Sequence, residues 1–514
     1  MELVMQVLTN VFSFDVLFVC FLGTLAGIIL GAIPGMNGGI GIAVMLPFTY
    51  SMSPASGLLF LGGMYLGSSY GGSISGILIN VPGTAEAACT AMEGYPMTQR
   101  GEGKKALYYS IIASGFGSLI GLVVLIFFSP ILSSISVKFG PPEMMLLAIC
   151  GLTIVGSLTG KNIAKGMIAA CIGLFLAMVG VDESTGSFRF TFGMRGLLGG
   201  VDLIPAVIGL FAITEMVKQG LGLINDEKDL STIELKPARF SAILKKSFGK
   251  YLSTLLRSSI VGTLIGVLPG TGGAISSFLA YGDAKSKDKD GTFGTGNPAG
   301  IIAPESANNA AVGGSLVPML SLGIPGSATS AIMFGALTIH GLIPGQRLFI
   351  DHADIVYTFM VGMFIVSFFM VLIGIVGIPL FVHILKLKLK YIIPVVILFS
   401  LIGAYSVNNS MNDVFIAIVL GVLGVLLARL EIPNTPIVLG LILGDIIESN
   451  FVRSSIIVKA QNLNFFGYIF SRPISIGIIV LTAYLIWANI RVLKRGKKIQ
   501  QAANINVEIG RAHV

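Results

Sequence analysis

The residues best suited to chemistry in this sequence surround four Pro-Gly pairs that lie within apolar segments. Proline lacks a backbone N–H and clashes with the preceding helical turn, so each pair should interrupt a helix. An interruption leaves backbone groups without helical partners. The N–H groups of a helix N-terminus can then attract anions, and exposed carbonyls can coordinate cations. Nearby Ser, Thr and Asn side chains add hydroxyl and amide groups without fixed charge. We therefore predict that these residues bind substrate or ions: Gly35, Asn37, Gly38, Ser73, Pro82, Gly83, Thr84, Gly270, Thr271, Gly272, Asn308, Asn309, Pro325, Gly326, Ser327 and Thr329.

The alternative interpretation of these pairs is purely structural. A lone Pro-Gly pair in an apolar helix more often provides a kink or a close helix contact, because small residues let backbones approach each other. Four pairs in matched positions favour a binding site. A glycine in an uninterrupted apolar segment, such as Gly121, is expected to tolerate alanine.

Two carboxylates adjoin the breaks and are candidates for ion coupling. Glu86 closely follows one Pro-Gly pair, and Glu305 precedes an Asn-Asn pair. A carboxylate within an apolar segment is a functional candidate because its burial is costly. Either residue could bind a sodium ion or carry a proton, and either could instead lie at the water interface. Glu93 also falls beside an apolar stretch.

Patterns that would indicate an enzyme fail on their spacing. The stretch Gly294–Gly300 resembles a dinucleotide fingerprint, but its final spacing is wrong and it lacks a strand–helix context. The stretch Gly156–Lys161 has too few residues between its glycines for a P-loop. The four cysteines form no CxxC pair. We therefore predict no enzyme, no catalytic residues, no organic cofactor and no metal other than sodium.

Membrane helices are the elements that must position these residues. The 514 residues are 54% hydrophobic and 11% charged, whereas a soluble domain carries about 25% charged residues. No charged residue occurs from Val16 to Ala85, a run of 70 residues. A membrane span takes roughly 20 apolar residues, so we predict an all-α polytopic membrane protein with about eleven to twelve transmembrane helices. A soluble core would need polar helix faces, which these segments lack.

The breaks recur in the same order in both halves, which predicts an internal duplication. The stretch Gly31–Gly39 corresponds to Gly266–Gly273. The triplet Gly71-Gly72-Ser73, with the Pro-Gly pair after it, corresponds to Gly313-Gly314-Ser315 and its own Pro-Gly pair.

Charge bias predicts the topology. Six basic residues and no acidic one lie from Lys236 to Arg257, so this segment should be cytoplasmic. The stretch Met1–Asp15 has no basic residue, so we place it outside and predict no signal peptide. The loop at 100–105 is basic and its counterpart at 347–354 is slightly acidic, which predicts inverted-topology repeats with interrupted or re-entrant helices. The expected parts are a first membrane repeat (1–222), a cytoplasmic linker (223–252), a second membrane repeat (253–492) and a basic tail (493–514), of which 508–514 resembles a translated sequencing adapter.

Five motif blocks resemble those of the large membrane subunit of the tripartite tricarboxylate transporters, TctA: Gly31–Gly39, Tyr70–Ala85, Gly266–Gly273, Pro304–Ser330 and Gly341–Leu348. The resemblance implies a secondary transporter of the bacterial inner membrane that imports tricarboxylates or related carboxylates, driven by a sodium or proton gradient. It also implies two partners, a small membrane subunit of the TctB type and a periplasmic solute-binding protein of the TctC type.

Three other functions compete with this one. A self-sufficient carboxylate–cation symporter would need no binding protein, and a passive channel would not depend on an ion gradient. An intramembrane enzyme would need a catalytic dyad or a metal set within the spans, and the sequence shows neither. Genes for a binding protein and a small membrane subunit beside this one would favour the tripartite system.

Overall fold

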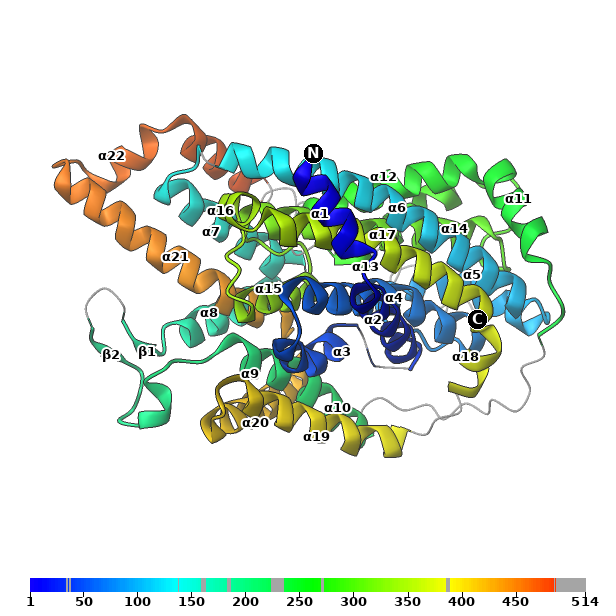
Figure 1. Ribbon diagram of the computed structural model, residues 1–514, viewed down its shortest axis with the longest axis horizontal. Helices are drawn as coiled ribbons and strands as arrows, with labels where there is room; N and C mark the ends of the chain where they lie inside the picture. The colour runs from blue at the N-terminus through cyan, green and yellow to red at the C-terminus, as the bar shows by residue number, and fades with distance from the viewer. Residues whose placement is uncertain are drawn as a thin grey trace, which may run out of the picture.

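The computed structural model describes residues 1–33, 36, 38–136, 138–158, 163–182, 186–222, 235–269, 272–384, 389–484 and 486, which are mostly helical (Figure 1). The first half contains α1 (Glu2–Val11), α2 (Phe14–Ala32), α3 (Gly38–Met45), α4 (Pro54–Ile79), α5 (Ala88–Gln99), α6 (Gly103–Ser136), α7 (Pro141–Leu158), α8 (Ile163–Ala177), α9 (Leu203–Val207) and α10 (Thr214–Gly220). A short antiparallel pair, β1 (Gly180–Val181) and β2 (Phe188–Arg189), follows α8.

The described part of the chain beyond residue 234 is also mostly helical. Its labelled helices are α11 (Phe240–Lys250), α12 (Leu252–Val267), α13 (Gly272–Ser286), α14 (Ala299–Leu322), α15 (Ala328–Ile339), α16 (Gln346–Asp351), α17 (Ala353–Val376), α18 (Ile378–Ile384), α19 (Leu389–Asn408), α20 (Met411–Arg429), α21 (Thr435–Ala460) and α22 (Phe465–Phe470). A further apolar helix follows at Pro473–Tyr484. Figure 1 shows α2 and α4 in the middle of the molecule, α19 and α20 along one edge, and α21 and α22 at the opposite end from α11.

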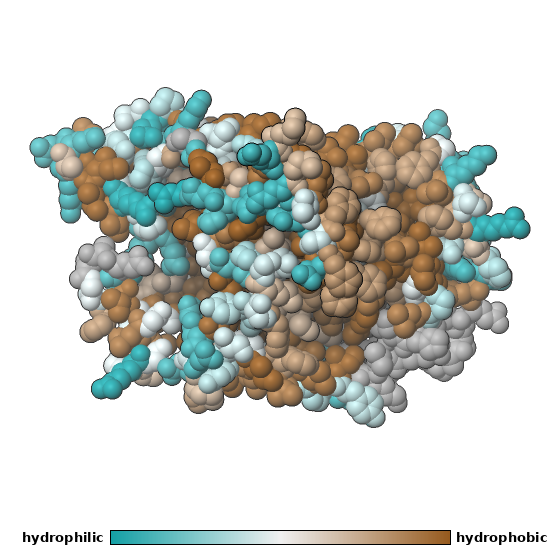
Figure 2. All heavy atoms as spheres, viewed as in Figure 1, coloured by the Kyte–Doolittle hydropathy of each residue, from teal (hydrophilic) through white to brown (hydrophobic). Residues whose placement is uncertain are grey.

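Seven helical segments of the described chain are long and apolar enough to cross a membrane, in agreement with the predicted membrane class. They are Phe14–Ala32, Gly103–Ile135, Leu203–Gly220, Ala353–Val376, Lys390–Asn408, Met411–Arg429 and Thr435–Ala460. The larger number of spans predicted from the sequence would also require shorter apolar helices, or α4 and α14, to cross. In Figure 2 hydrophobic residues cover much of the visible face right of its centre, whereas hydrophilic residues lie across its left half and at its right edge.

Helices α4 and α14 form the interior of the bundle. Almost every residue from Ser56 to Ile79 is buried, as is every residue from Gly300 to Ser321. Because protein surrounds them on all sides, these helices need no large apolar residues for a lipid face. Gly, Ser and Asn therefore occupy positions where a lipid-facing helix would carry Leu or Ile.

Glycines let the neighbouring helices pack directly on α4 and α14. A Cβ atom at Gly27 of α2 would overlap the backbone of Met64 on α4. A Cβ atom at Gly262 of α12 would overlap the backbone of Ala307 on α14 in the same way. Such close backbone contact through small residues is typical of membrane helix pairs. The α2–α4 and α12–α14 pairs thus share one packing pattern.

The chain breaks after α4 and α14 are also built alike. The first ends at Asn80 and the second at Gly323, each with a left-handed backbone. Beyond them, the N–H of Gly83 donates to the carbonyl of Gly72 at 3.0 Å, and the N–H of Gly326 donates to that of Ser315 at 3.4 Å. Both bonds reach back eleven residues.

This match corrects the alignment of the two halves by one residue. The sequence motifs align Gly72 with Gly314, whereas the equivalent backbone hydrogen bonds align Gly72 with Ser315. Packing agrees, because Gly71 lies on the backbone of Ile28 as Gly314 lies on that of Thr263. The opposite orientation of the two halves stays a prediction.

Candidate functional site

A cavity of about 350 Å³ lies between the breaks of the two halves. We call it the candidate pocket. Seven predicted residues line it: Gly38, Thr84, Glu86, Gly272, Asn308, Ser327 and Thr329. The chain therefore brings residues far apart in the sequence to one place, as the paired motifs suggested. Four further predicted residues lie outside the described part of the chain: Gly35, Asn37, Gly270 and Thr271.

Three helices begin at this pocket. The first residues of α3, α13 and α15 are Gly38, Gly272 and Ala328, and all three line the cavity. A helix N-terminus carries N–H groups without intrahelical partners and a partial positive charge. At α15 the Ser327 side chain accepts the N–H of Ser330 at 3.0 Å, which uses one of these donors. Those that remain suit an anionic ligand.

Tyr65 of α4 joins the two halves at the pocket wall. Its hydroxyl bonds to Ser327 at 2.7 Å and to Ser315 at 3.0 Å, both in the second half. Asn308 of α14 reaches the other way, and its side-chain amide donates to the carbonyl of Ser69 on α4 at 3.1 Å. In the corrected alignment Tyr65 and Asn308 occupy equivalent positions. Each half thus contributes one long polar side chain to the other.

Two lining residues differ in what they offer a ligand. The Thr84 hydroxyl is buried and has no hydrogen-bond partner among the described residues, so it can bind a ligand. Glu86 is the one charged residue in the described lining of the pocket. An anionic ligand would meet repulsion from Glu86 unless a proton or a cation accompanied it.

Ser73 and Glu305 lie outside the pocket, in a buried cluster of their own. The Glu305 carboxylate on α14 is 1% exposed and accepts hydrogen bonds from the hydroxyls of Ser73, Thr90, Ser110 and Ser114. These four residues come from α4, α5 and α6. We call Glu305 and its four partners the hydroxyl cage.

The remaining predicted residues support the pocket and do not line it. A Cβ atom at Gly83 would overlap the carbonyl oxygen of Gly31, and one at Gly326 would overlap that of Gly266. Pro82 and Pro325 precede these glycines in the breaks. Asn309 is fully buried, and its amide donates to the carbonyl of Glu305 at 3.1 Å, one turn back on its own helix.

Backbone N–H groups of the stretch Gly294–Gly300 donate hydrogen bonds to Glu93, which lies on α5. Glu93 is fully buried, and its carboxylate accepts the backbone N–H groups of Gly294, Gly296 and Asn297. The Tyr281 hydroxyl of α13 donates to the same carboxylate at 2.9 Å. The glycine pattern excluded as a nucleotide site therefore wraps an internal anion, since successive N–H groups in a loop bind anions well.

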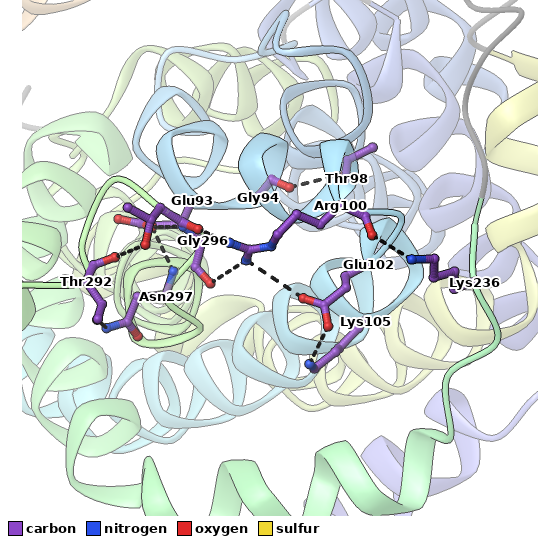
Figure 3. Close-up of polar contacts among 11 residues, drawn as sticks. Glu93, Gly94, Thr98, Arg100, Glu102, Lys105, Lys236, Thr292, Gly296 and Asn297 are labelled. Atoms are coloured by element: carbon purple, nitrogen blue, oxygen red, sulfur yellow. Dashed lines mark hydrogen bonds and ion pairs between the residues drawn. The ribbon is translucent and has the colours of Figure 1, made fainter. Parts of the chain in front are cut away.

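Arg100 reinforces this connection from the surface (Figure 3). Its guanidinium donates to the carbonyls of Thr295 and Gly296 in the loop. The Lys236 ammonium donates in turn to the Arg100 carbonyl at 3.1 Å. We call the Glu93 and Arg100 contacts with loop 287–298 the loop clasp. It fixes the end of α5 against the loop that connects α13 and α14.

Residues 17–439 match the family described as the tripartite tricarboxylate transporter TctA family. The chain belongs to this TctA family. It is a family of transporters and not of enzymes, so the TctA resemblance and the exclusion of an enzyme are confirmed.

Two curated relatives of this TctA protein come from Agrobacterium vitis. An uncharacterized 52.8 kDa protein in the TAR-I ttuC′ 3′ region is 34% identical over 447 residues, which is 87% of this chain and 88% of the relative. An uncharacterized protein in the TAR-II ttuC′ 3′ region is 35% identical over 201 residues, which is 39% of this chain and 83% of the relative. No solved structure matches.

Sequence reasoning on this TctA protein missed Tyr65, Ser69 and the three partners of Glu305 other than Ser73. Tyr65 lies in an uncharged helical stretch without a break, so nothing in its surroundings marks it as polar lining. One signal was present: aligning the halves on their Pro-Gly pairs sets Tyr65 opposite Asn308.

Proposed function

We propose that the candidate pocket binds a tricarboxylate or a related carboxylate, and that the chain moves it inward by alternating access. The chain is the membrane component of a tricarboxylate transporter by family. The observation that supports this use of the pocket is the meeting of three helix N-termini, from both halves, at one cavity.

Pocket chemistry fits a carboxylate ligand. The N-terminal N–H groups and the Asn308 amide are donors, and hydroxyls of Thr84 and Thr329 can donate as well. The volume of about 350 Å³ lies near the lower end of the roughly 300–1,000 Å³ range of small-molecule sites. Residues from both halves would lose contact with the ligand when the halves move apart, which is how midplane sites work in secondary transporters.

Energy for uptake would come from a sodium or proton gradient. Glu86 in the pocket and Glu305 in the hydroxyl cage are the residues that could bind the coupling ion. Each is a carboxylate that a proton or a monovalent cation would neutralise.

We also propose the tripartite arrangement in the bacterial inner membrane. A TctB-type small subunit would assemble with this chain, and a TctC-type periplasmic protein would deliver the carboxylate. Family membership supports both partners. The competing proposal is a self-sufficient symporter with the same pocket.

Uptake of labelled carboxylates into proteoliposomes tests this proposal. The chain would be reconstituted alone and with its two partners, each under a sodium gradient, a pH gradient and neither. We expect gradient-dependent uptake only with the partners present, and weaker uptake by Thr84→Ala. Strong uptake by the chain alone would favour the self-sufficient symporter. Uptake without any gradient in either preparation would contradict secondary transport.

A further inference from the structure

The hydroxyl cage is an unusual environment for a carboxylate. Oε1 of Glu305 accepts the hydroxyls of Ser73 and Thr90, the latter at 2.5 Å. Oε2 accepts those of Ser110 at 3.1 Å and Ser114 at 2.8 Å. All five side chains are at most 1% exposed. None of the ion pairs found within the described chain includes Glu305.

The cage lies next to the candidate pocket along two helices. On α4, Ser69 lines the pocket and Ser73 follows it by one turn. On α14, Asn308 lines the pocket and Glu305 precedes it by one turn. The amide of Asn308 is bonded to the carbonyl of Ser69, which ties the two helices together between pocket and cage.

Titratable groups around Glu305 come from several helices. Tyr70 of α4 and Cys89 of α5 interact with it electrostatically, and Tyr108 of α6 interacts with Tyr70. On α13, the Tyr281 hydroxyl donates a hydrogen bond to Glu93. The basic residue of α12 is Arg257, which forms an ion pair with Asp283. Free Tyr and Cys side chains are mostly neutral near pH 7, whereas a free carboxylic acid is ionised there. Glu305 is therefore the group in this cluster that can carry a negative charge and be neutralised by a proton.

We propose that Glu305 is the proton-binding residue of the transport cycle, with the four hydroxyls of the cage as its partners. This rests on the proposed transport function and names its coupling ion. A proton from water adds to one carboxylate oxygen, and the new O–H donates to a hydroxyl, which rotates from donor to acceptor. The proton leaves by the reverse step when the cage next opens to water.

Direct contact between the hydroxyls and the carboxylate favours a proton over a sodium ion. Each of the four hydroxyl oxygens already touches a carboxylate oxygen, so the cage is collapsed onto Glu305. A proton needs no added space. A sodium ion would have to enter between oxygens that now touch each other, so the hydroxyls would have to move away from the carboxylate.

Because Glu305 is buried between the two halves, its protonation state affects how stably they contact each other. Ionised Glu305 has four donors but no cation beside it in the described chain, which is costly in a membrane interior. Protonation removes that charge and lets the cage stay closed. Since α14 belongs to the second half and α4, α5 and α6 to the first, the proton stabilises their contact next to the ligand.

The test uses the chain reconstituted with its partners and compares Glu305→Gln with wild type. Glutamine keeps the size and hydrogen bonding of the neutral acid but cannot release a proton. We expect exchange of labelled for unlabelled carboxylate to persist, because exchange needs no net proton movement, and accumulation under a pH gradient to be lost. Accumulation by Glu305→Gln at the wild-type level under a pH gradient would overturn the proposal. Wild-type uptake driven by a sodium gradient and indifferent to a pH gradient would also overturn it.

An infrared titration gives a readout that does not depend on transport. Wild type should show a protonated-carboxyl band that Glu305→Gln lacks. Ser114→Ala removes one donor to the ionised form and should move the midpoint of that band to higher pH. Ser129→Ala is the matched control, because Ser129 is a buried α6 serine without a described hydrogen-bond partner. An unshifted midpoint in Ser114→Ala overturns the role of the cage, whereas failure of wild type to transport any carboxylate overturns only the proposed function.

Discussion

The carboxylate of Glu93 on α5 accepts the backbone N–H of Gly296 at 2.7 Å, between residues 203 positions apart in the chain. Two further backbone N–H groups and the Tyr281 hydroxyl complete its shell. These four donors hold the Glu93 carboxylate in place, and the conformation of loop 287–298 depends in turn on that carboxylate. Without the carboxylate, three backbone N–H groups would lose their acceptor together.

Glu93→Ala should therefore loosen the loop clasp and destabilise the protein. Leaving buried donors without partners costs on the order of 1–3 kcal/mol for each group. Thermal unfolding in detergent and limited proteolysis at loop 287–298 would measure the effect. Glu102→Gln is the control, because Glu102 is 35% exposed and its pairs with Arg100 and Lys105 should contribute only about 0–1 kcal/mol. Equal melting temperatures for the two variants would contradict the importance of the clasp.

Gly83→Leu and Gly326→Leu should both abolish transport. Even a Cβ atom at either glycine would overlap a backbone carbonyl, of Gly31 or Gly266, so the neighbouring helices must separate. Initial uptake rates at matched membrane expression would show the loss. Near-normal transport in both variants would mean that the breaks tolerate side chains and do not shape the pocket.

A control for these variants needs a glycine whose added Cβ atom meets no neighbouring helix. Sequence reasoning offered Gly121 as harmless, but a Cβ atom there would overlap the backbone of Ala310 on α14, so that expectation was wrong. Gly282 of α13 is suitable, since nothing lies within 4 Å of its added Cβ. Gly282→Ala should leave uptake unchanged.

Much of the pocket could be predicted because chain breaks leave a signature in composition. Proline and glycine inside uncharged runs mark Gly38, Thr84 and Ser327 without any knowledge of packing. Contacts between distant segments leave no such mark. The backbone N–H groups that hold Glu93 have no side-chain signal, and the carbonyl that Gly121 faces belongs to a helix far away in the sequence.

Asn308 and Asn309 are adjacent in sequence but should respond differently to alanine. Asn308 lines the pocket and bridges to Ser69, whereas Asn309 donates to the carbonyl of Glu305 in its own helix. Asn308→Ala should raise the carboxylate concentration needed for half-maximal uptake, because it removes a hydrogen bond worth on the order of 1 kcal/mol. Asn309→Ala should change it less. Substrate dependence of uptake at matched expression measures both, and the reverse order would move the binding site away from the candidate pocket.

Cysteine labelling can test the inverted arrangement of the halves. Lys245 on α11 lies in the basic segment expected in the cytoplasm, and Asp351 at the end of α16 lies in the acidic loop expected outside. Both are exposed, so cysteines introduced there should react with a membrane-impermeant maleimide from one side each. Of the native cysteines, Cys20, Cys89 and Cys150 are buried and Cys171 is exposed, so Cys171→Ser gives the background.

Right-side-out and inside-out vesicles would then separate the two sites. We expect Lys245→Cys to label only in inside-out vesicles and Asp351→Cys only in right-side-out vesicles. Lys236, which precedes α11, contacts Arg100 in the basic loop of the first half, so that loop lies on the same face as Lys245. Such a result would therefore place the basic loop of the first half and its counterpart in the second half on opposite faces of the membrane. Labelling of both sites from the same face would instead require the two halves to run parallel, and the matched packing of α2–α4 and α12–α14 would then reflect a duplication without inversion.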